Sequence, residues 1–284
     1  MPERLPVVAA IPNYNMGQQL AALLPELAQQ DYADVFVLDD ASTDGSREVV
    51  ESFNHGSGVH FVAGAENKGA GPTRNLIIGA LGYNAVIHFL DADITLKTER
   101  IPEVVYDMMP SEPVGFVGGL ALAPEGTQSV WNYGPRQGMR GDMGASLQMK
   151  IEPLVNSDPE KGKALRKRFE GLLADWPDPF SVPVRRQVFW NIEQNLLISS
   201  DVFAEVGGFN ETLREHEIQD LAIRLYDKGL PRWFDPSISV QHKNEQNVRA
   251  YNRQVAVFRT ELRIARMQGI RNWFLPNGKF RAEL

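Results

Sequence analysis

Two aspartates separated by one residue follow a buried apolar run and could bind a metal ion. Asp91 and Asp93 flank Ala92 directly after the run from Val86 to Leu90. The chain contains no cysteine, so oxygen and nitrogen atoms are its ligands, and carboxylate oxygens suit Mg²⁺ or Mn²⁺. Such an ion would stabilise a diphosphate as a leaving group. An isolated Asp-x-Asp pair is more often a turn with capping carboxylates, and its position after a strand favours the metal site here.

A second pair of acidic residues, Asp39 and Asp40, follows the apolar run 35–38. A carboxylate accepts hydrogen bonds and can therefore bind the ring N–H of uracil or guanine. We interpret Asp39, which directly follows the predicted strand, as a nucleobase ligand. Asp40 and Asp44 are also suited to capping the next helix, because short acidic side chains accept hydrogen bonds from the first N–H groups of a helix. For Asp44 the capping role is the favoured interpretation.

A glycine-rich segment with basic residues follows a third apolar run. Residues 67–71 read Asn-Lys-Gly-Ala-Gly, and Arg74 lies about one helical turn further on. Glycines allow the backbone to approach a ligand closely, and basic side chains bind phosphate oxygens. Lys68, Gly69 and Arg74 therefore form a cationic glycine loop after the third predicted strand.

These clusters require a sheet that brings the ends of several strands together. The first hundred residues alternate strand and helix signals, which is typical of a mainly parallel sheet. Ligands of open α/β sheets bind beyond the carboxyl ends of the strands, so Pro12 and Tyr14, after the first strand, join the other clusters at one edge. This edge could hold a base, a ribose, a diphosphate and a divalent cation. Strands are expected at 7–11, 35–38, 59–62 and 86–90, and Asn15 is expected to cap the helix after the first strand.

The composition is that of an ordinary globular protein. The chain has 284 residues, of which 43% are hydrophobic and 23% charged, and this length fits one large α/β domain or two small ones. The formal net charge of −7 argues against polyanion binding by the protein as a whole. No apolar run reaches the length of a signal-peptide core or a membrane span, so we expect a cytoplasmic protein without an integral anchor. Residues 134–190 hold Gly, Pro and many charges, which indicates an inserted, partly helical region on the acceptor side.

The order of these motifs resembles that of family 2 glycosyltransferases, over about residues 5–242. The resemblance implies the GT-A fold, an α/β fold with a Rossmann-like, mainly parallel sheet and helices on both faces. It also implies the transfer of a sugar from a nucleotide-sugar donor, usually with inversion. The matching stretches are 10–15 (Ala-Ile-Pro-Asn-Tyr-Asn), 38–45 (Leu-Asp-Asp-Ala-Ser-Thr-Asp-Gly), 66–69 with Arg74-Asn75, 91–93, 207–211 (Gly-Gly-Phe-Asn-Glu), 220–225 (Asp-Leu-Ala-Ile-Arg-Leu), Asp235-Pro236 and His242.

Carried over by position, the resemblance implies a nucleotide-sugar site that binds a divalent cation. Asp91, Asp93 and His242 would hold Mn²⁺ or Mg²⁺, and Asp91 would also face the ribose. The donor is expected to be a nucleoside-diphosphate sugar, and Asp39 and Asp40 favour UDP as its nucleotide. The residues implied for the nucleotide-sugar site are Pro12, Tyr14, Asp39, Asp40, Lys68, Gly69, Arg74, Asp91, Ala92 and Asp93.

The catalytic base is the point at which this chain departs from the family. The family usually shows Glu-Asp-x-Asp-Leu, in which the second acid activates the acceptor hydroxyl. Here residues 217–221 read Glu-Ile-Gln-Asp-Leu, so Ile218 stands at that aspartate. Glu217 is the first candidate for the base and Asp220 the second, and either could instead be a carboxylate at the helix surface or the edge of the core. A base must come within hydrogen-bond distance of the acceptor hydroxyl.

The expected organisation is a GT-A domain over residues 1–242 and a C-terminal arm over 243–284. The donor-binding half would occupy about 1–100 and the acceptor-side half about 101–242. The arm has nine Lys and Arg against three Glu (9 − 3 = +6), and its apolar residues recur three and four apart, which predicts a basic amphipathic helix. It could dock on the domain, form a contact between subunits, or meet an anionic membrane surface or acidic acceptor. The apolar stripe consists of Val248, Tyr251, Val255, Phe258, Leu262 and Ala265.

Other classes of protein fit these motifs less well. A sugar-phosphate nucleotidyltransferase would share the fold but needs a glycine-rich, arginine-containing loop where this chain has Pro-Asn-Tyr at 12–14. A dinucleotide dehydrogenase would have Gly-x-Gly-x-x-Gly there. A non-catalytic module that binds nucleotide sugars or nucleic acid stays open because the second acid is missing, as does a glycosyltransferase acting on modified nucleic acid. The acceptor is equally open among glycans, lipid-linked glycans, proteins and nucleic acids.

Overall fold

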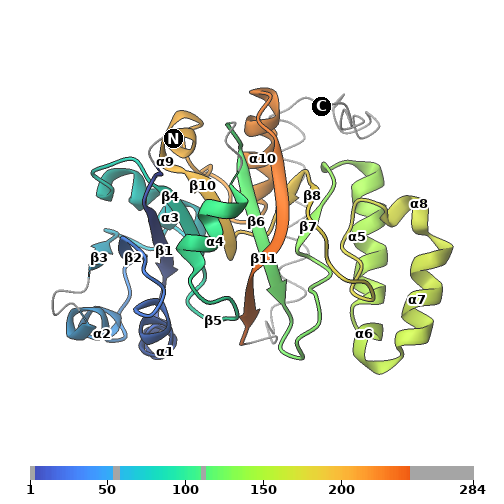
Figure 1. Ribbon diagram of the computed structural model, residues 1–284, viewed down its shortest axis with the longest axis horizontal. Helices are drawn as coiled ribbons and strands as arrows, with labels where there is room; N and C mark the ends of the chain where they lie inside the picture. The colour runs from blue at the N-terminus through green and yellow to red at the C-terminus, as the bar shows by residue number, and fades with distance from the viewer. Residues whose placement is uncertain (1–3, 54–57, 110–112, 244–284) are drawn as a thin grey trace.

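The computed structural model describes residues 4–53, 58–109 and 113–243, and it has a central sheet with helices on both sides (Figure 1). The predicted arm lies outside the described residues, except for Lys243. No helix in the described ranges has the length and apolar composition needed to cross a membrane. Within these ranges the sheet has the order β3-β2-β1-β4-β10-β6-β11-β5, and β8 pairs with β11. The strands are β1 (Val7–Asn13), β2 (Asp34–Asp39), β3 (Val59–Ala63), β4 (Val86–Leu90), β5 (Ile94–Leu96), β6 (Phe116–Leu122), β8 (Arg186–Gln187), β10 (Asn195–Ser199) and β11 (Arg232–His242).

Four parallel strands form the first half of the sheet. β1 pairs in parallel with β2 and β4, and β2 pairs in parallel with β3. The strands are connected by α1 (Gly17–Leu27), α2 (Ser46–Phe53) and α3 (Ala70–Ala80), as the alternating signals predicted. The register places Asn13 opposite Asp39, so the polar residues that end these strands lie level at one edge.

The strands beyond β4 run in mixed directions. β10 lies between β4 and β6 and is antiparallel to both, whereas β11 is parallel to β6 and antiparallel to β5 and β8. Asn195, the first residue of β10, pairs with Leu90, the last residue of β4. The residues that precede β10 therefore lie at the same edge as those that follow β4.

Alternation along β1 explains why both faces of the sheet are covered. Val8 and Ala10 pack into one apolar cluster with Ile77 of α3, whereas Ala9 and Ile11 pack into another with leucines of α1. Successive strand residues point to opposite faces, so a strand covered on both faces needs a continuous apolar run. The helical cover is completed by α4 (Ile101–Met108), α9 (Ser200–Glu205) and α10 (Glu217–Asp227).

A group of short helices lies beside the second half of the sheet (Figure 1). It lies within the segment 134–190 that the sequence indicated as partly helical. Trp176, which follows these helices, packs edge-to-face against Trp131 and Trp190, with ring centroids 5.8 Å apart in both pairs, and so joins the group to the core. The helices are α5 (Met139–Ile151), α6 (Leu154–Ser157), α7 (Pro159–Arg168) and α8 (Glu170–Leu173), and the small sheet of β7 (Tyr133–Gly134) and β9 (Trp190–Asn191) flanks them.

A buried histidine at the centre of the sheet links three elements. The hydroxyl of Tyr32 lies 2.7 Å from His88 Nδ1, and Asn195 Oδ1 lies 2.8 Å from His88 Nε2. Because Asn195 Nδ2 donates to the carbonyls of Leu120 and Ile238, its Oδ1 must accept from His88, whose Nδ1 then accepts from Tyr32. Burial lowers the pKa of His88 to about 4, so the imidazole is neutral near neutral pH.

Candidate active site

Asp39, at the end of β2, is a buried carboxylate held by two donors. Its Oδ1 accepts a hydrogen bond from Asn13 Nδ2 at 2.7 Å, and its Oδ2 accepts one from the backbone N–H of Ser42 at 2.9 Å. Each carboxylate oxygen can accept a second hydrogen bond, so Asp39 keeps acceptor capacity for a nucleobase N–H. Pro12 is partly buried beside this strand end, and the side chain of Tyr14 is 50% exposed.

Asp40 holds the glycine-rich loop in place. Its Oδ1 accepts from the backbone N–H of Lys68 and its Oδ2 from that of Gly69, both at 2.8 Å. Gly69 has a φ of 95°, which L side chains rarely adopt, and a Cβ at this position would lie 2.9 Å from Arg214 Nη1. The loop therefore requires glycine here, and Asp40 fixes its path. A direct contact of Asp40 with a nucleobase stays a prediction.

Asp44 joins the first turns of two helices, as its favoured capping role requires. It accepts from the backbone N–H of Gly17, which begins α1, and of Ser46, which begins α2. Partial burial acts to raise the pKa of Asp44, but the hydrogen bonds from Ser46 and Gly17 outweigh it and lower the pKa. The prediction that Asn15 caps α1 is wrong. Asn15 has a positive φ of 54°, and its side chain instead accepts from the N–H of Thr43.

Asp91 and Asp93, which follow β4, come together with His242, the last residue of β11. One ligand atom from each lies within 4.8 Å of the others, and Asp93 Oδ1 is 3.4 Å from His242 Nε2. Burial raises the pKa of Asp93; His242 opposes this rise and Asp91 adds to it. Ala92 is buried in the apolar cluster beneath, so only its backbone is available to a ligand. Two carboxylates and an imidazole form a donor set for a divalent cation, whose charge would offset the carboxylate repulsion.

Arg74 links this group to further acidic side chains. It is 3% exposed, its Nη2 donates to Asp91 Oδ1 at 2.8 Å, and its Nη1 lies 3.8 Å from Glu193 Oε1. Burial raises the pKa of Glu193 above its usual range; Arg74 opposes the shift, while Asp91 and Glu217 add to it. One guanidinium thus pairs with two carboxylates, and its buried Nε and Nη1 atoms have no hydrogen-bond partner within the described residues.

The two candidates for the catalytic base have different surroundings. Glu217 begins α10 and is buried next to Gly71, where a Cβ would lie 3.0 Å from Glu217 Cγ. Burial raises the pKa of Glu217, while its own N–H and Arg74 oppose the rise. Asp220 is 2% exposed and pairs with Arg224, whose Nε lies 2.8 Å from Asp220 Oδ2. Glu217 therefore belongs to the acidic group around Arg74, and Asp220 forms an ion pair within its own helix.

Ile218, at the position of the family's aspartate, is buried in the hydrophobic core together with Leu221. Its side chain therefore does not take part in the acidic group. The carboxylate that this position usually supplies must come from another residue. Glu217 and Glu193 are candidates, because both lie close enough to Arg74 for its charge to oppose the rise in pKa that burial causes.

Sequence reasoning missed Glu193 and Arg214. Glu193 precedes a strand instead of following one, and it reaches this edge only because β10 runs antiparallel to β4. Arg214 lies in the connection between α9 and α10 and approaches Gly69. The sequence does show a mostly polar segment, 191–195, directly before an apolar run. It does not show that the strand formed by this run is antiparallel to β4, and this direction is what brings Glu193 to the site.

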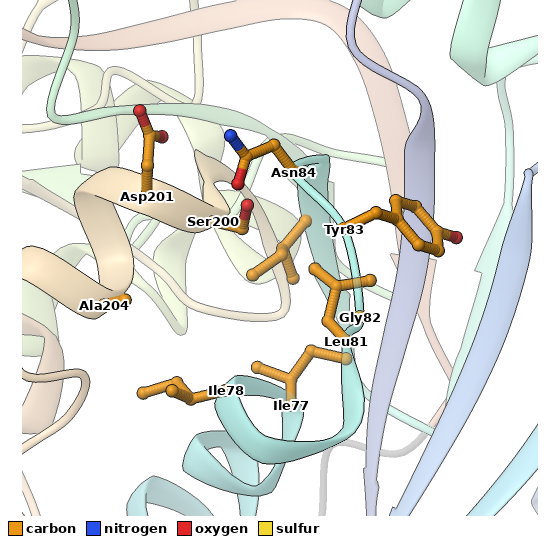
Figure 2. Close-up of a pocket in the computed structure, with 10 residues that line it drawn as sticks. Ile77, Ile78, Leu81, Gly82, Tyr83, Asn84, Ser200, Asp201 and Ala204 are labelled. Atoms are coloured by element: carbon orange, nitrogen blue, oxygen red, sulfur yellow. The ribbon is translucent and has the colours of Figure 1, made fainter.

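Two pockets lie at opposite edges of the sheet. One, of about 220 Å³, is lined by His242 and by residues of the β6–β7 connection such as Trp131. The other, of about 280 Å³, lies between the end of α3 and the start of α9 (Figure 2). Tyr83 and Asn84, which precede β4, line this second pocket, so it opens at the amino edge of the parallel strands, away from the candidate active site.

Solved structures with a similar architecture include glycosyltransferases of the GT-A fold. The Pyrobaculum calidifontis mannosyltransferase PcManGT, in complex with GDP-Man and Mn²⁺, has a TM-score of 0.55 and 16% identity over 87% of this chain and 59% of that chain. GalNAc-T7 with UDP, GalNAc and Mn²⁺ has a TM-score of 0.58 and 10% identity over 87% of this chain and 45% of that chain. Staphylococcus aureus TarS 1–349 with UDP-GlcNAc has a TM-score of 0.52 and 15% identity over 85% and 60% of the two chains. The protein therefore has the expected GT-A fold.

Residues 8–175 match the family described as Glycosyl transferase family 2. This match spans more than half of the chain, so the protein belongs to glycosyltransferase family 2, as the motifs indicated. A relative, the Bacillus subtilis glycosyltransferase TuaG, which is assigned to teichuronic acid biosynthesis, is 28% identical over 127 residues. That similarity covers 43% of this chain and 50% of TuaG, so the chain spans about half the length of this relative. Glu193, Glu217 and His242 lie beyond the residues that match the family.

Proposed function

We propose that this protein transfers a sugar from a nucleoside-diphosphate sugar to a hydroxyl group of an acceptor, with the help of Mn²⁺ or Mg²⁺. The observation that carries the proposal is the group formed by Asp91, Asp93 and His242 at the same sheet edge as Asp39 and the Gly69 loop. Membership of family 2 supports it. Similar solved structures contain nucleotide sugars, GDP-Man with Mn²⁺ in PcManGT and UDP-GlcNAc in TarS.

On this proposal the first half of the chain binds the nucleotide. Asp39 accepts a hydrogen bond from the ring N–H of the base, and Pro12 and Tyr14 flank the base. Lys68 and Gly69 meet the ribose or the phosphates, in a loop whose path depends on Asp40. UDP is the favoured nucleotide because Asp39 offers an acceptor to the uracil N–H.

The residues present fit a divalent cation. Asp91 and Asp93 would supply carboxylate oxygens and His242 an imidazole nitrogen. When bound, the cation stabilises the negative charge that develops on the diphosphate leaving group. Arg74 orients Asp91 through the 2.8 Å hydrogen bond, and such neighbours of metal ligands fix the ligand geometry.

We assign the role of general base to Glu217. A carboxylate with a raised pKa is a stronger base than an ordinary one, and burial raises the pKa of Glu217. It would take the proton of the acceptor hydroxyl as this oxygen attacks the anomeric carbon, and the nucleoside diphosphate would leave from the opposite face, which inverts the configuration. Asp220 keeps its ion pair with Arg224 in this scheme.

Location and assembly stay predictions. A cytoplasmic protein is expected, and the basic arm at 243–284 would bring it to a membrane surface or to a second subunit. The arm is also a candidate contact for an acidic acceptor.

A donor panel tests the proposal. Purified protein is mixed with Mn²⁺ and with UDP-, GDP- and dTDP-sugars, and nucleotide release and thermal shift are measured. We expect release from at least one UDP-sugar, dependent on Mn²⁺ or Mg²⁺ and abolished by a chelator. Absence of both thermal shift and release with every donor, or full activity in excess chelator, contradicts the proposal.

A further inference from the structure

A pocket next to the candidate metal site has no role in the scheme above. It lies between the β6–β7 connection, the junction of α5 and α6, and the residues just before β10. His242 forms part of its wall, so the pocket borders the group that is proposed to hold the metal ion. Its volume is about 220 Å³, below the range of about 300–1,000 Å³ typical of sites for drug-sized ligands. Space of this size suits a single ring.

The lining of this pocket is suited to a neutral, hydroxyl-rich ligand. Of the described residues that line it, none is Lys or Arg, and its charged members are Glu125 and Glu152. An anion such as a diphosphate would therefore be repelled. The remaining polar members are amides and hydroxyls, which both donate and accept hydrogen bonds. The lining also includes the aromatic ring of Trp131, and a flat apolar ring combined with amides matches the mixed apolar and polar faces of a sugar.

The aromatic wall is fixed in position before any ligand arrives. Trp131 Nε1 donates to Glu152 Oε1 at 2.9 Å. The ring of Trp131 also packs edge-to-face on Trp176 at an interplanar angle of 86°. A side chain that is already held loses little conformational entropy on binding, which is the physical advantage of a preorganised site.

The polar wall contains an unsatisfied group. Gln128 is 7% exposed, and its Oε1 has no hydrogen-bond partner within the described residues. A buried carbonyl oxygen without a partner costs free energy. A ligand hydroxyl recovers this free energy when the Gln128 amide turns towards the pocket. Gln194, also buried, and Asn156, which is exposed, line the same pocket.

The topology of the sheet separates this pocket from the nucleotide. β2, which carries Asp39, lies on one side of β4, whereas β6 and β11, which end at the pocket, lie on the other side. Asp91 and Asp93, after β4, lie between the two. A donor whose base is at Asp39 and whose diphosphate is at Asp93 therefore leaves this pocket to the second substrate.

We propose that this pocket binds one sugar ring of a carbohydrate acceptor, with Trp131, Gln128, Gln194 and Asn156 as its contacts. The assignment rests on the proposed function, because it takes the Asp39 side as the nucleotide site. It adds the class of the acceptor, a glycan whose reactive hydroxyl is presented from this ring or from its neighbour to the metal site.

The test uses methyl glycosides of the common hexoses and N-acetylhexosamines as probes. Binding to the full chain is followed by saturation-transfer difference NMR, with and without UDP and Mn²⁺. We expect at least one glycoside to bind in both conditions, without competition from UDP. Asn156→Ala should weaken this binding about tenfold and Trp131→Ala should abolish it, while the affinity for UDP and Mn²⁺ stays unchanged. Asn84→Ala, an exposed asparagine at the other pocket (Figure 2), is the matched control and should change neither.

Trp131 also packs against the core, so Trp131→Phe, which keeps a ring, accompanies Trp131→Ala. The pocket assignment is overturned if UDP and Mn²⁺ bind normally but no glycoside binds, or if glycoside binding is equal in Asn156→Ala, Trp131→Phe and the parent. Displacement of the glycoside by a nucleotide sugar but not by UDP also overturns it, because the pocket would then hold the donor sugar. Failure of UDP itself to bind counts against the proposed function, and so the two failures are distinguishable.

Discussion

Acidic side chains gather in two regions at the same edge of the sheet, and the protein neutralises them in different ways. The loop carboxylates, Asp39, Asp40 and Asp44, follow β2. Four of their six oxygens accept from a side chain or a backbone group in a different segment of the chain. The other two accept from the backbone N–H groups of Ser42 and Ser46, two or three residues further along the same loop. Their negative charge is met by N–H groups that the fold itself supplies.

The cluster carboxylates, Asp91, Asp93, Glu193 and Glu217, have fewer donors. Asp91 and Glu193 pair with Arg74, which also acts to lower the pKa of Glu217, while Asp93 has His242 as its partner. Burial raises the pKa of Asp93, Glu193 and Glu217, whereas the pKa of Asp44 in the other group is lowered.

We infer from this difference that the loop carboxylates hold the structure of the site, whereas the cluster carboxylates bind a ligand. A carboxylate with its hydrogen bonds satisfied stabilises the fold whether or not a substrate is present. A group of carboxylates that destabilise one another becomes favourable when a cation arrives, because the cation replaces their repulsion by attraction. The loop carboxylates should therefore matter for stability, and the cluster carboxylates for metal binding and turnover.

Replacement of Asp93 should have the largest effect on activity. Asp93→Asn removes a ligand charge, and loss of a metal's charge stabilisation amounts to several kcal/mol, or about 1,000-fold in kcat/KM. Because burial and Asp91 raise the pKa of Asp93, its ionised form is disfavoured in the metal-free fold, and the variant should melt at a higher temperature without metal at pH 8. Steady-state kinetics and calorimetry measure both, with the exposed Asp107→Asn as control. If metal-free Asp93→Asn is less stable than the metal-free parent, the proposed difference between the loop carboxylates and the cluster carboxylates is wrong.

Replacement of Glu217 should reduce turnover and leave donor binding intact. General-base catalysis contributes about 100- to 10,000-fold, so Glu217→Gln should lower kcat at least about 100-fold with an unchanged Kd for UDP. In the parent, activity should fall as pH falls through the pKa of Glu217, at a pH above the usual range for glutamate, because the protonated form is inactive. Asp220→Asn should instead lower stability, since it leaves Arg224 without its partner. If Asp220→Asn removes turnover and Glu217→Gln does not, the two roles are exchanged.

Replacement of a loop carboxylate should affect stability first. Asp40→Asn loses one of two charge-assisted bonds to the N–H groups of Lys68 and Gly69 and weakens the other. At about 1.5–3 kcal/mol for each such bond, we expect the free energy of unfolding to fall by about 3 kcal/mol in urea titrations. An unchanged unfolding midpoint would show that the loop does not depend on Asp40.

A smaller effect is expected from His88, which lies outside both regions and therefore serves as a reference. Its pKa in the folded state, about 4, is below the ordinary value of 6.5, so the unfolded chain binds more protons between these two pH values. Its contribution to stability is complete above about pH 6.5 and is lost as pH falls towards 4, by about 2 kcal/mol between pH 7 and 5. Urea titrations at both pH values check this, and His88→Gln should flatten the difference by that amount.

The first region could be predicted from the sequence because its geometry follows from local rules. Apolar runs that alternate with helical patterns predict parallel strands, and parallel strands place their carboxyl ends at one edge. Asp39 and Gly69 were identified in this way, and the same rule identified Asp91 of the second region. The sequence alone does not show that Asp40 holds the glycine-rich loop while Asp39 keeps acceptor capacity for a ligand. These roles depend on which N–H groups the folded loop brings near each carboxylate.

The second region could be predicted only in part, because its residues arrive from elements whose direction the sequence does not show. Glu193 precedes an antiparallel strand, and Arg214 lies in an irregular connection. His242 and Glu217 were placed by resemblance to the family and not by a rule of folding. The structure pairs Asp220 with Arg224, four residues away on the same helix, and this local ion pair favours a structural role for Asp220.

The most direct test of the account is a calorimetric titration of the metal-free protein with Mn²⁺ in the presence of UDP. We expect one binding site per chain, released by a chelator, with affinity lost in Asp93→Asn and retained in Asp44→Asn under conditions in which both variants are folded. Equal Mn²⁺ binding by the parent and Asp93→Asn, or no binding to the parent, would contradict the claim that the cluster carboxylates form the metal site.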